Sequence, residues 1–411
     1  MDFTPTEEQT AARDLAARVF GDLSTPERLA AAGSGTDAEL WKALCAAGLT
    51  SAVEDVGLLG LVLLLEEQGR TTAQVPFAVS CVYGLLAVGR HGTREQRARL
   101  LPALRDGSAV ATGAFPDRGA VRAGADGRLT GTTGWVPWLR DATHVLVPDA
   151  DRSLWLVRVA DAGTVPVVTT APWAAAELRL EATPAERLGS VGAYGDVLAA
   201  ARVAYAGLQA GVCAGSLARA VAHTSVREQF GRPLSTRQAV QLRAADAHMD
   251  TEVIRVTAYE AAWRFDEGLP CASHVLTAGW WASEAGRRVV HTGQHLHGGI
   301  GADLDHPVHR HFLWGRQIDA HLGCGARLLD ELGAVLADEE HEEHEEHDEP
   351  AGPDEPAGPD EPAGPDEPAG PAGHSEPGRP GGQSVHEERR GREEQGEQEE
   401  QGEHEEQEET A

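Results

Sequence analysis

Hydrophobic residues recur with a helical period over the first 108 residues of the chain. Ala11, Leu15, Val19 and Phe20 fall on one side of such a helix. Thr6, which precedes two glutamates, is typical of a helix start. The same pattern predicts further helices after Thr36-Asp37, over the apolar run Leu58–Leu65 up to a stop at Gly69, and over Thr93–Arg105.

From about Ser108 the pattern becomes short and alternating, with glycines between the segments. Val145 and Val147 alternate with other residues, and Leu178 and Leu180 alternate with charged ones. A period of two bounded by turn residues predicts strands. This middle region is therefore expected to form a small β-barrel or sandwich.

Near Asp196 the helical period returns and continues to about residue 337. One stripe has members three to four positions apart: Leu242, Ala245, Met249, Val253 and Val256. Long amphipathic helices of this kind pack side by side in a bundle. We expect a mainly α fold with a central β-domain, divided into helices at 1–108, strands at 109–195, a four-helix bundle at 196–337 and a tail at 338–411.

Charge is concentrated in the tail. The formal net charge is −30, and residues 338–411 hold 28 acidic residues against four arginines. The remainder has no basic face for nucleic acid. The tail has few apolar residues, so we expect it to be disordered. His341, His344 and His347 are interpreted as part of this solvated segment, and no metal site is predicted.

Cysteines and apolar runs place further bounds on the protein. The five cysteines are scattered, and none forms a C-x-x-C pair. The start of the chain does not resemble a signal peptide, and Leu58–Leu65 is too short to span a bilayer. No G-x-G-x-x-G follows a predicted strand. We expect a reduced, cytoplasmic protein with neither a membrane span nor a Rossmann nucleotide site.

Two motifs in the C-terminal half suggest a family. The segment 227–234 reads R-E-Q-F-G-R-P-L and is followed by Gln238, and the segment 297–301 reads H-G-G-I-G. In this order they are similar to the R-x-x-F-G-x-x-[IL]…Q and H-G-G-x-G signatures of the acyl-CoA dehydrogenases. The resemblance covers residues 1 to about 337. It implies oxidation of an acyl thioester between its α and β carbons, with FAD accepting the hydride.

The resemblance also implies a cofactor surface. In the family, FAD lies between the β-domain and the bundle, and its pyrophosphate and adenosine reach a neighbouring subunit. Arg227 offers a planar fork suited to phosphate oxygens. Gly298 and Gly299 allow close approach of the backbone. Phe230 and Gln238 match positions that line the adenosine.

The positions of the catalytic base depart from the family. Removal of a weakly acidic α-proton requires a positioned base, which the family supplies as a glutamate in one of two places. Matching from the motifs, these places hold Leu322 and Ala201. Asp319 and His321 are nearby as weak candidate bases, although a solvated loop residue is the favoured interpretation of both.

The residues expected around the flavin ring depart as well. The family's T-E-P-x-x-G-S-D stretch corresponds to residues 112–119, which keep Pro116 and little else. The K-x-W-I-[TS]-N strand keeps Trp135 and loses its polar followers. His295 occupies the place of a common glutamine, and Gln294 is one position off. The residues expected at the flavin ring have therefore diverged from the family motifs, whereas those expected at the pyrophosphate and adenosine match them.

Three hypotheses follow. The chain is a base-lacking subunit of a heteromeric dehydrogenase (a heterotetramer), in which a homologous partner carries the base and the contacts to the flavin ring. Alternatively, it is a self-sufficient homo-oligomer that acts on acyl-CoA or carrier-bound acyl groups with an unusual base. The third hypothesis is a non-catalytic binding protein of the same fold, with the acidic tail as an interaction arm.

Overall fold

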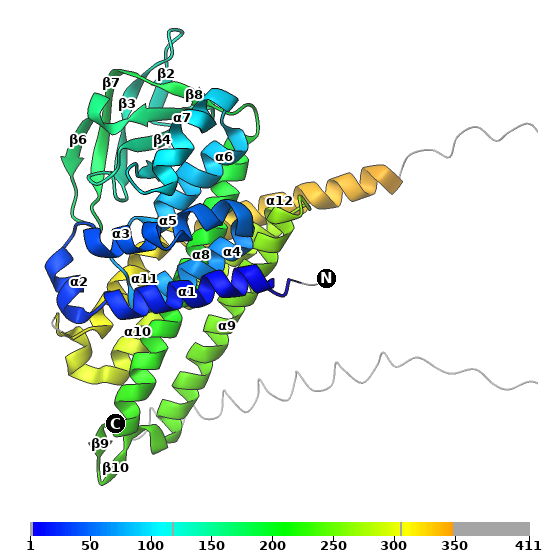
Figure 1. Cartoon of the computed structure of the whole chain (residues 1–411). Helices are drawn as coiled ribbons and strands as arrows, with labels where there is room; N and C mark the ends of the chain where they lie inside the picture. The colour runs from blue at the N-terminus through cyan, green and yellow to red at the C-terminus, as the bar shows by residue number, and fades with distance from the viewer. Residues whose placement is uncertain (1–2, 117–118, 305, 348–411) are drawn as a thin grey trace, which may run out of the picture. The chain divides into compact units, whose positions relative to one another are not determined.

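The computed structural model describes residues 3–116, 119–304 and 306–347, with the backbone alone for Leu322 and 339–347. Helices come first, two sheets follow, and long helices complete the described part (Figure 1). The predicted mainly α fold with a central β-domain is confirmed. The predicted tail falls partly outside this description, because residues 348–411 lie beyond it.

The N-terminal helices begin where capping residues predict them. Thr6 and Gln9 form a capping box at the start of α1, and the Asp37 side chain accepts a hydrogen bond from Leu40 N at 3.0 Å at the start of α3. Thr93 and Gln96 repeat the capping box before α7. The helices are α1 (Glu7–Leu23), α2 (Pro26–Ala32), α3 (Ala38–Ala46), α4 (Leu49–Thr71), α5 (Phe77–Val79), the π-helix η1 (Ser80–Leu86), α6 (Ala87–His91) and α7 (Arg94–Arg105).

Gly69 is not the stop that the sequence predicts for α4. The helix continues to Thr71, and Thr72 ends it in the left-handed conformation (φ 48°). A Cβ on Gly69 would lie 2.2 Å from the carbonyl oxygen of Leu208, on α8. The glycine is therefore needed for the close approach of two helices, and it lies inside the helix that it was expected to end.

Two four-stranded sheets form the β-domain. One has the order β1-β4-β5-β8 with β1 parallel to β4, and the other has the antiparallel order β2-β3-β7-β6. Val145 and Val157 of the first sheet share a buried cluster with Leu129, Leu178 and Leu180 of the second, which makes a sandwich. The strands are β1 (Ala111–Gly113), β2 (Val121–Ala123), β3 (Arg128–Val136), β4 (His144–Pro148), β5 (Leu154–Arg158), β6 (Gly163–Pro166), β7 (Ala176–Pro184) and β8 (Glu186–Leu188), with the short helix η2 (Val159–Asp161) before β6.

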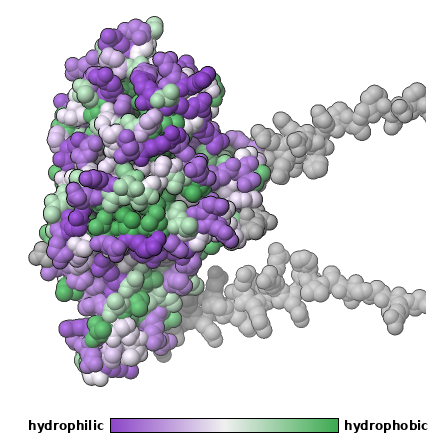
Figure 2. Space-filling model, in the orientation of Figure 1, coloured by the Kyte–Doolittle hydropathy of each residue, from purple (hydrophilic) through white to green (hydrophobic). Residues whose placement is uncertain are grey.

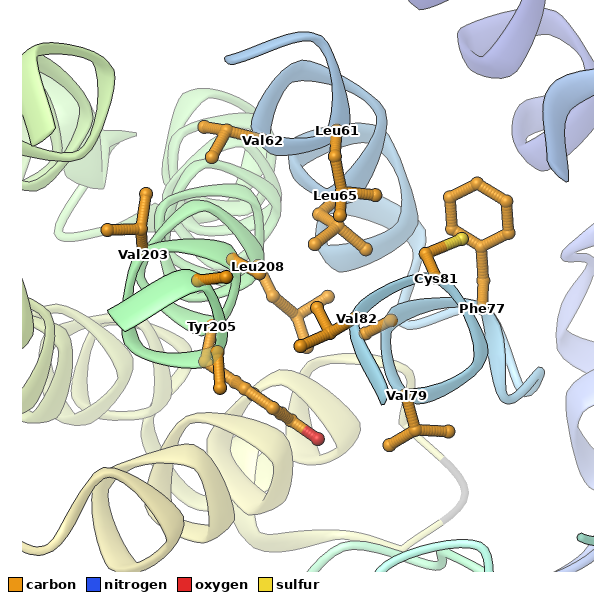
Figure 3. Packing of buried hydrophobic residues seen from close by; sticks show 14 of the residues in the cluster. Leu61, Val62, Leu65, Phe77, Val79, Cys81, Val82, Val203, Tyr205 and Leu208 are labelled. Carbon is orange, nitrogen blue, oxygen red and sulfur yellow. The ribbon is translucent and has the colours of Figure 1, made fainter. Parts of the chain in front are cut away.

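The long α8 is the central element of the C-terminal bundle. It packs on α4, α9, α10 and α11, and Figure 3 shows Leu61, Val62 and Leu65 of α4 beside Val203 and Leu208 of α8. The bundle elements are α8 (Ala193–Val226), the hairpin β9 (Glu228–Gln229) and β10 (Arg232–Pro233), η3 (Leu234–Thr236), α9 (Gln238–Asp266), α10 (Ala272–His297), η4 (Gly298–Ala302), α11 (Val308–Leu322) and α12 (Gly325–His347). Residues 338–347 of the predicted tail thus continue α12 as a helix.

The α8 helix is also long and apolar enough to cross a membrane by length and composition. Its most apolar stretch is 83% buried inside the protein. The pair α3 and α4 passes the same test only if the two helices count as one span, and they are bent by 74°. The apolar character of α8 is thus used in packing against its neighbours.

The apolar stripe of α9 faces the opposite way from the prediction. Leu242, Met249 and Val256 are 56%, 59% and 49% exposed. The positions that α9 buries hold Ala247, Ile254 and smaller residues. Small side chains let the helices approach closely, and the larger apolar ones remain on the surface.

In Figure 2 most of the visible face is hydrophilic, with a hydrophobic area near its middle.

The contact between α4 and α8 predicts the effect of adding one methyl group. A Cβ on Gly211 would lie 2.0 Å from the Glu66 carbonyl oxygen, whereas one on Gly195 of the same helix meets nothing within 4 Å. We expect Gly211→Ala to lower the free energy of unfolding by roughly 1–3 kcal/mol, and Gly195→Ala to leave it unchanged or raise it by up to about 1 kcal/mol. Urea denaturation measures both, and equal effects would contradict the packing described.

Candidate active site

One of the two predicted base positions, Ala201, lines a small cavity. Ala201 of α8 lines it, and so does His321, the neighbour of Leu322 at the end of α11. The cavity has a volume of about 20 Å³, about the space of one water molecule. Its lining residues are Tyr83, Phe115, Pro116, Leu198, Ala201, Arg202, Tyr205 and His321. Among the described residues, no carboxylate lines this cavity.

Of the two candidate replacement bases, the structure brings His321 to the cavity and directs Asp319 elsewhere. The Asp319 carboxylate accepts a hydrogen bond from Ser283 Oγ at 2.5 Å and lies 3.5 Å from a guanidinium nitrogen of Arg316. His321 is buried, and its ring centroid lies 4.3 Å from that of Tyr205 and 5.4 Å from that of Trp135. His321 is therefore held among aromatic rings, and the expectation that Asp319 and His321 are solvated loop residues is wrong, because both are buried side chains of the helix α11.

A carboxylate close to the cavity is bound to the arginine beside Ala201. Arg202 donates a hydrogen bond from Nη2 to Glu331 Oε2 at 2.5 Å. Burial raises the pKa of the Glu331 carboxyl, but the hydrogen bonds and charges of Arg202 and Arg327 together lower it overall. Arg327 also contacts this carboxylate, at 3.1 Å. Glu331 is thus held ionised in a pair with two arginines, which is a poor arrangement for a general base.

Aromatic side chains fill the space beside the base positions. Phe115 stacks between Tyr83 and Tyr194, with ring centroids 5.1 and 5.5 Å away. The Tyr83 hydroxyl is buried without a hydrogen-bond partner in the described part of the chain. Burial raises the pKa of this hydroxyl well above its ordinary value, so it stays protonated. The region that would receive a reacting acyl group is thus packed with side chains.

A second cavity separates the two segments that resemble the family's flavin-ring contacts. Ala114, Phe115 and Pro116 form one wall, and Trp135 and Val136 form the other. Its volume is about 100 Å³. It lies within the β-domain part of the chain and adjoins the aromatic stack through Phe115.

The residues here do not fit an isoalloxazine ring. The ring presents polar atoms that need hydrogen-bond donors, and the family uses a hydroxyl after its tryptophan. Pro137 occupies that position and has neither a hydroxyl nor a backbone N–H. Thr133 Oγ1 is buried and lacks a partner among the described residues, but a cavity of about 100 Å³ is too small for a three-ring system. We therefore assign no step of a reaction to a flavin ring held by this chain alone.

The predicted dinucleotide contacts gather at the other end of the bundle. Arg227 ends α8 and Gln238 begins α9, so both lie next to the β9–β10 hairpin (Figure 1). His295 and Gly298 lie at the end of α10. The rings of His223 on α8 and His297 on α10 stack at 4.7 Å, which holds these two helix ends together.

All six predicted cofactor residues are exposed: Arg227, Phe230, Gln238, His295, Gly298 and Gly299. The Phe230 side chain is 92% exposed and lies 5.1 Å from the Arg237 guanidinium. Gly298 has φ 67°, and a Cβ there or on Gly299 would meet nothing within 4 Å. These residues thus form an open face that presents a guanidinium, an aromatic ring and exposed backbone.

Sequence reasoning missed the aromatic stack and the Arg202–Glu331 pair. Tyr83 lies in an apolar segment without alternation. Phe115 lies in the stretch 112–119, which keeps little of the family motif besides Pro116. The Arg202–Glu331 pair joins residues far apart in sequence, and no local pattern predicts it.

Family models match most of the described chain. The N-terminal domain of acyl-CoA dehydrogenases matches residues 6–108, and the C-terminal domain matches residues 193–335. The chain therefore belongs to the acyl-CoA dehydrogenase family, whose members are FAD-dependent oxidoreductases that act on CH–CH groups.

Particular relatives come from steroid and mycobacterial dehydrogenases. Acyl-CoA dehydrogenase FadE27 of Mycobacterium tuberculosis is 33% identical over 373 residues, with 82% of this chain and 99% of the relative covered. The ChsE4-ChsE5 complex from the same organism is 32% identical with a TM-score of 0.78, and the Tcur3481-Tcur3483 steroid ACAD G363A variant is 40% identical with a TM-score of 0.77. Each structure covers 82% of this chain and is itself 99% covered.

The aromatic packing around the cavity at Ala201 predicts how much stability is lost when the Phe115 ring is removed. Phe115 is 7% exposed and Phe230 is 92% exposed. We expect Phe115→Ala to lower the free energy of unfolding by about 3–5 kcal/mol, and Phe230→Ala by less than about 0.5 kcal/mol. Urea denaturation of both variants measures this. A near-neutral Phe115→Ala variant would show that the space is built for a ligand.

Proposed function

We propose that this chain is the base-lacking subunit of a heteromeric acyl-CoA dehydrogenase. A homologous partner supplies the glutamate and holds the flavin ring and the reacting acyl group. This chain supplies the open face of Arg227, Phe230 and Gln238 to the pyrophosphate and adenosine of that flavin. The observation that carries the proposal is the cavity at Ala201, which has no carboxylate among its described lining and is filled by aromatic rings.

The exposed cofactor face supports a role shared with a second chain. A pyrophosphate needs cationic donors around it, and Arg227 stands on an open surface without enclosing walls. Stacking on the exposed Phe230 ring would bury an apolar surface that is otherwise in water. Both features become a site once another subunit covers them.

An apolar surface beside this face supports assembly with a homologous chain. It follows the end of α8, the hairpin and α9, and we call it the outer apolar surface; its exposed members are Val221, Val226, Phe230, Leu242, Met249 and Val256. Leu242, Met249 and Val256 are seven positions apart, so they lie along one side of α9, and exposed apolar surface of this kind can mark a site of protein association. The similar structures include a ChsE4-ChsE5 complex, and we infer a heteromer of the same kind. The substrate is an acyl-CoA, and the compartment is the cytoplasm.

One observation favours the second candidate, a self-sufficient dehydrogenase. His321 lines the same cavity as Ala201 and lies beside Leu322. An imidazole in that place has the ordinary chemistry of a general base. In that case the isolated chain would carry out dehydrogenation with His321 as its base.

Turnover measurements separate the two candidates. We expect the isolated full chain to reduce no artificial electron acceptor with acyl-CoA, and the chain co-expressed with a glutamate-bearing homologue to do so. In the pair, replacing the partner's glutamate with glutamine should lower kcat by roughly 10²–10⁴-fold, whereas His321→Gln should change it by less than about threefold. Turnover by the isolated chain that is abolished by His321→Gln would establish the alternative.

A further inference from the structure

A cavity of about 360 Å³ lies beside the first turns of α11, and its lining contains neither the residues of the cavity at Ala201 nor the six predicted cofactor residues. Its walls come from the α1–α2 turn and α2, from the end of α4, and from the first turns of α11, with one residue of α8. Apolar wall residues include Leu29, Leu304 and Leu313, and the polar ones include Thr72, His309 and two arginines, Arg219 and Arg310. It is larger than the cavity at Ala201 and is polar on one side.

Arg310 is held in this wall by neutral acceptors. Its Nη2 donates to Gln74 Oε1 at 3.0 Å and to the Thr72 carbonyl at 3.4 Å, and its Nε donates to Thr72 Oγ1 at 3.4 Å. Its Nη1 has no hydrogen bond to the described residues. Burial lowers the pKa of this guanidinium to about 10, and no acidic neighbour offsets that cost. The side chain is thus fixed in position with its charge uncompensated.

Arg219 of α8 is the second cation of the cavity. It is half-buried, and it makes no hydrogen bond or ion pair with any part of the chain that the structure describes. Burial lowers its pKa as well. Its charge reaches His297, His306 and His311, whose pKa values are lowered first by burial and further by Arg219. The surroundings of the cavity are therefore positive.

No carboxylate lines the cavity within the described residues. Asp303 lies near His306 but is not part of the lining. Among the described residues neither guanidinium has an acidic partner, and a partly buried cation is more stable when an anion pairs with it. A bound anion such as phosphate would accept charge-assisted hydrogen bonds from these guanidiniums.

We propose that this cavity binds the phosphate group of a small phosphomonoester. Arg219 and Arg310 together supply two positive charges, which match a phosphate dianion better than a single carboxylate. His309 and Thr72 supply further polar groups at the same wall. The leucine-lined side gives room and apolar contact for the organic part of the ligand. The proposal does not depend on whether the chain supplies a catalytic base.

Titration calorimetry on the full chain tests the proposal. The probes are inorganic phosphate and phenyl phosphate, with benzyl alcohol as the neutral control. We expect both phosphates to bind and benzyl alcohol not to bind. Tighter binding of phenyl phosphate identifies an organic phosphomonoester as the ligand class, whereas equal or weaker binding overturns that class in favour of free phosphate.

Variants locate the binding. Arg219→Gln and Arg310→Lys should each weaken phenyl phosphate about tenfold or more, because each removes a charge-assisted or bidentate contact. The exposed Arg243→Gln should leave it unchanged. Arg219→Gln should also raise stability in the absence of phosphate, since it removes an unpaired cation, and should lose the stabilisation that phosphate gives.

Two results would overturn the proposal. One is phosphate binding that is absent or is the same in Arg219→Gln as in the parent chain. The other is a parent chain that binds no phosphate while Arg219→Gln weakens subunit assembly, which would show that an acidic side chain of another subunit fills the cavity.

Discussion

The close contact of α4 with α8 is the constraint on which the rest of the structure depends. Gly69 on one helix and Gly211 on the other bring the two backbones together, with no room for a Cβ at either position. Gly207 makes a similarly close approach to Val62. Because α8 is then buried over most of its length, its side chains are fixed at both ends of the bundle. One end carries Ala201 and Arg202, and the other carries Arg219 and Arg227.

The two ends of α8 carry residues whose surroundings differ. Near its start the predicted base position holds Ala201, and the neighbouring Arg202 is paired with Glu331. The surrounding space is taken up by Tyr83, Phe115 and Tyr194. Near its end Arg227 remains exposed beside a hairpin that still presents Phe230. The packed end favours a structural role, and the open end favours a contact with a shared cofactor.

Much of the fold could be predicted from the sequence, because caps and periods are local signals. Thr6, Asp37 and Thr93 mark helix starts correctly, and the alternation around Val145 and Leu178 marks strands. Gly69 and the α9 stripe were misread for a common reason. Whether a glycine lies inside a helix, and whether an apolar stripe faces solvent, both depend on which element packs against that helix. The sequence carries no local signal for this contact.

The candidate site was predictable in part for a related reason. The motif residues could be located by number, and the structure gathers them at the ends of α8, α9 and α10. Their roles remain predictions. Whether Asp319 or His321 reaches the cavity depends on which side of α11 faces the cavity in its last turns. Only the packing of the folded protein determines this. The aromatic filling and the Arg202–Glu331 pair arise from distant segments and carry no local signature.

The ratio of bound flavin to protein in the co-purified pair tests the account most directly. If this chain gives only the dinucleotide face and its partner gives the ring site, the pair holds one FAD per two chains, and the chain purified alone holds almost none. Absorbance of the released flavin against protein concentration measures this ratio. One FAD per chain, in the pair or in the isolated protein, would contradict the account.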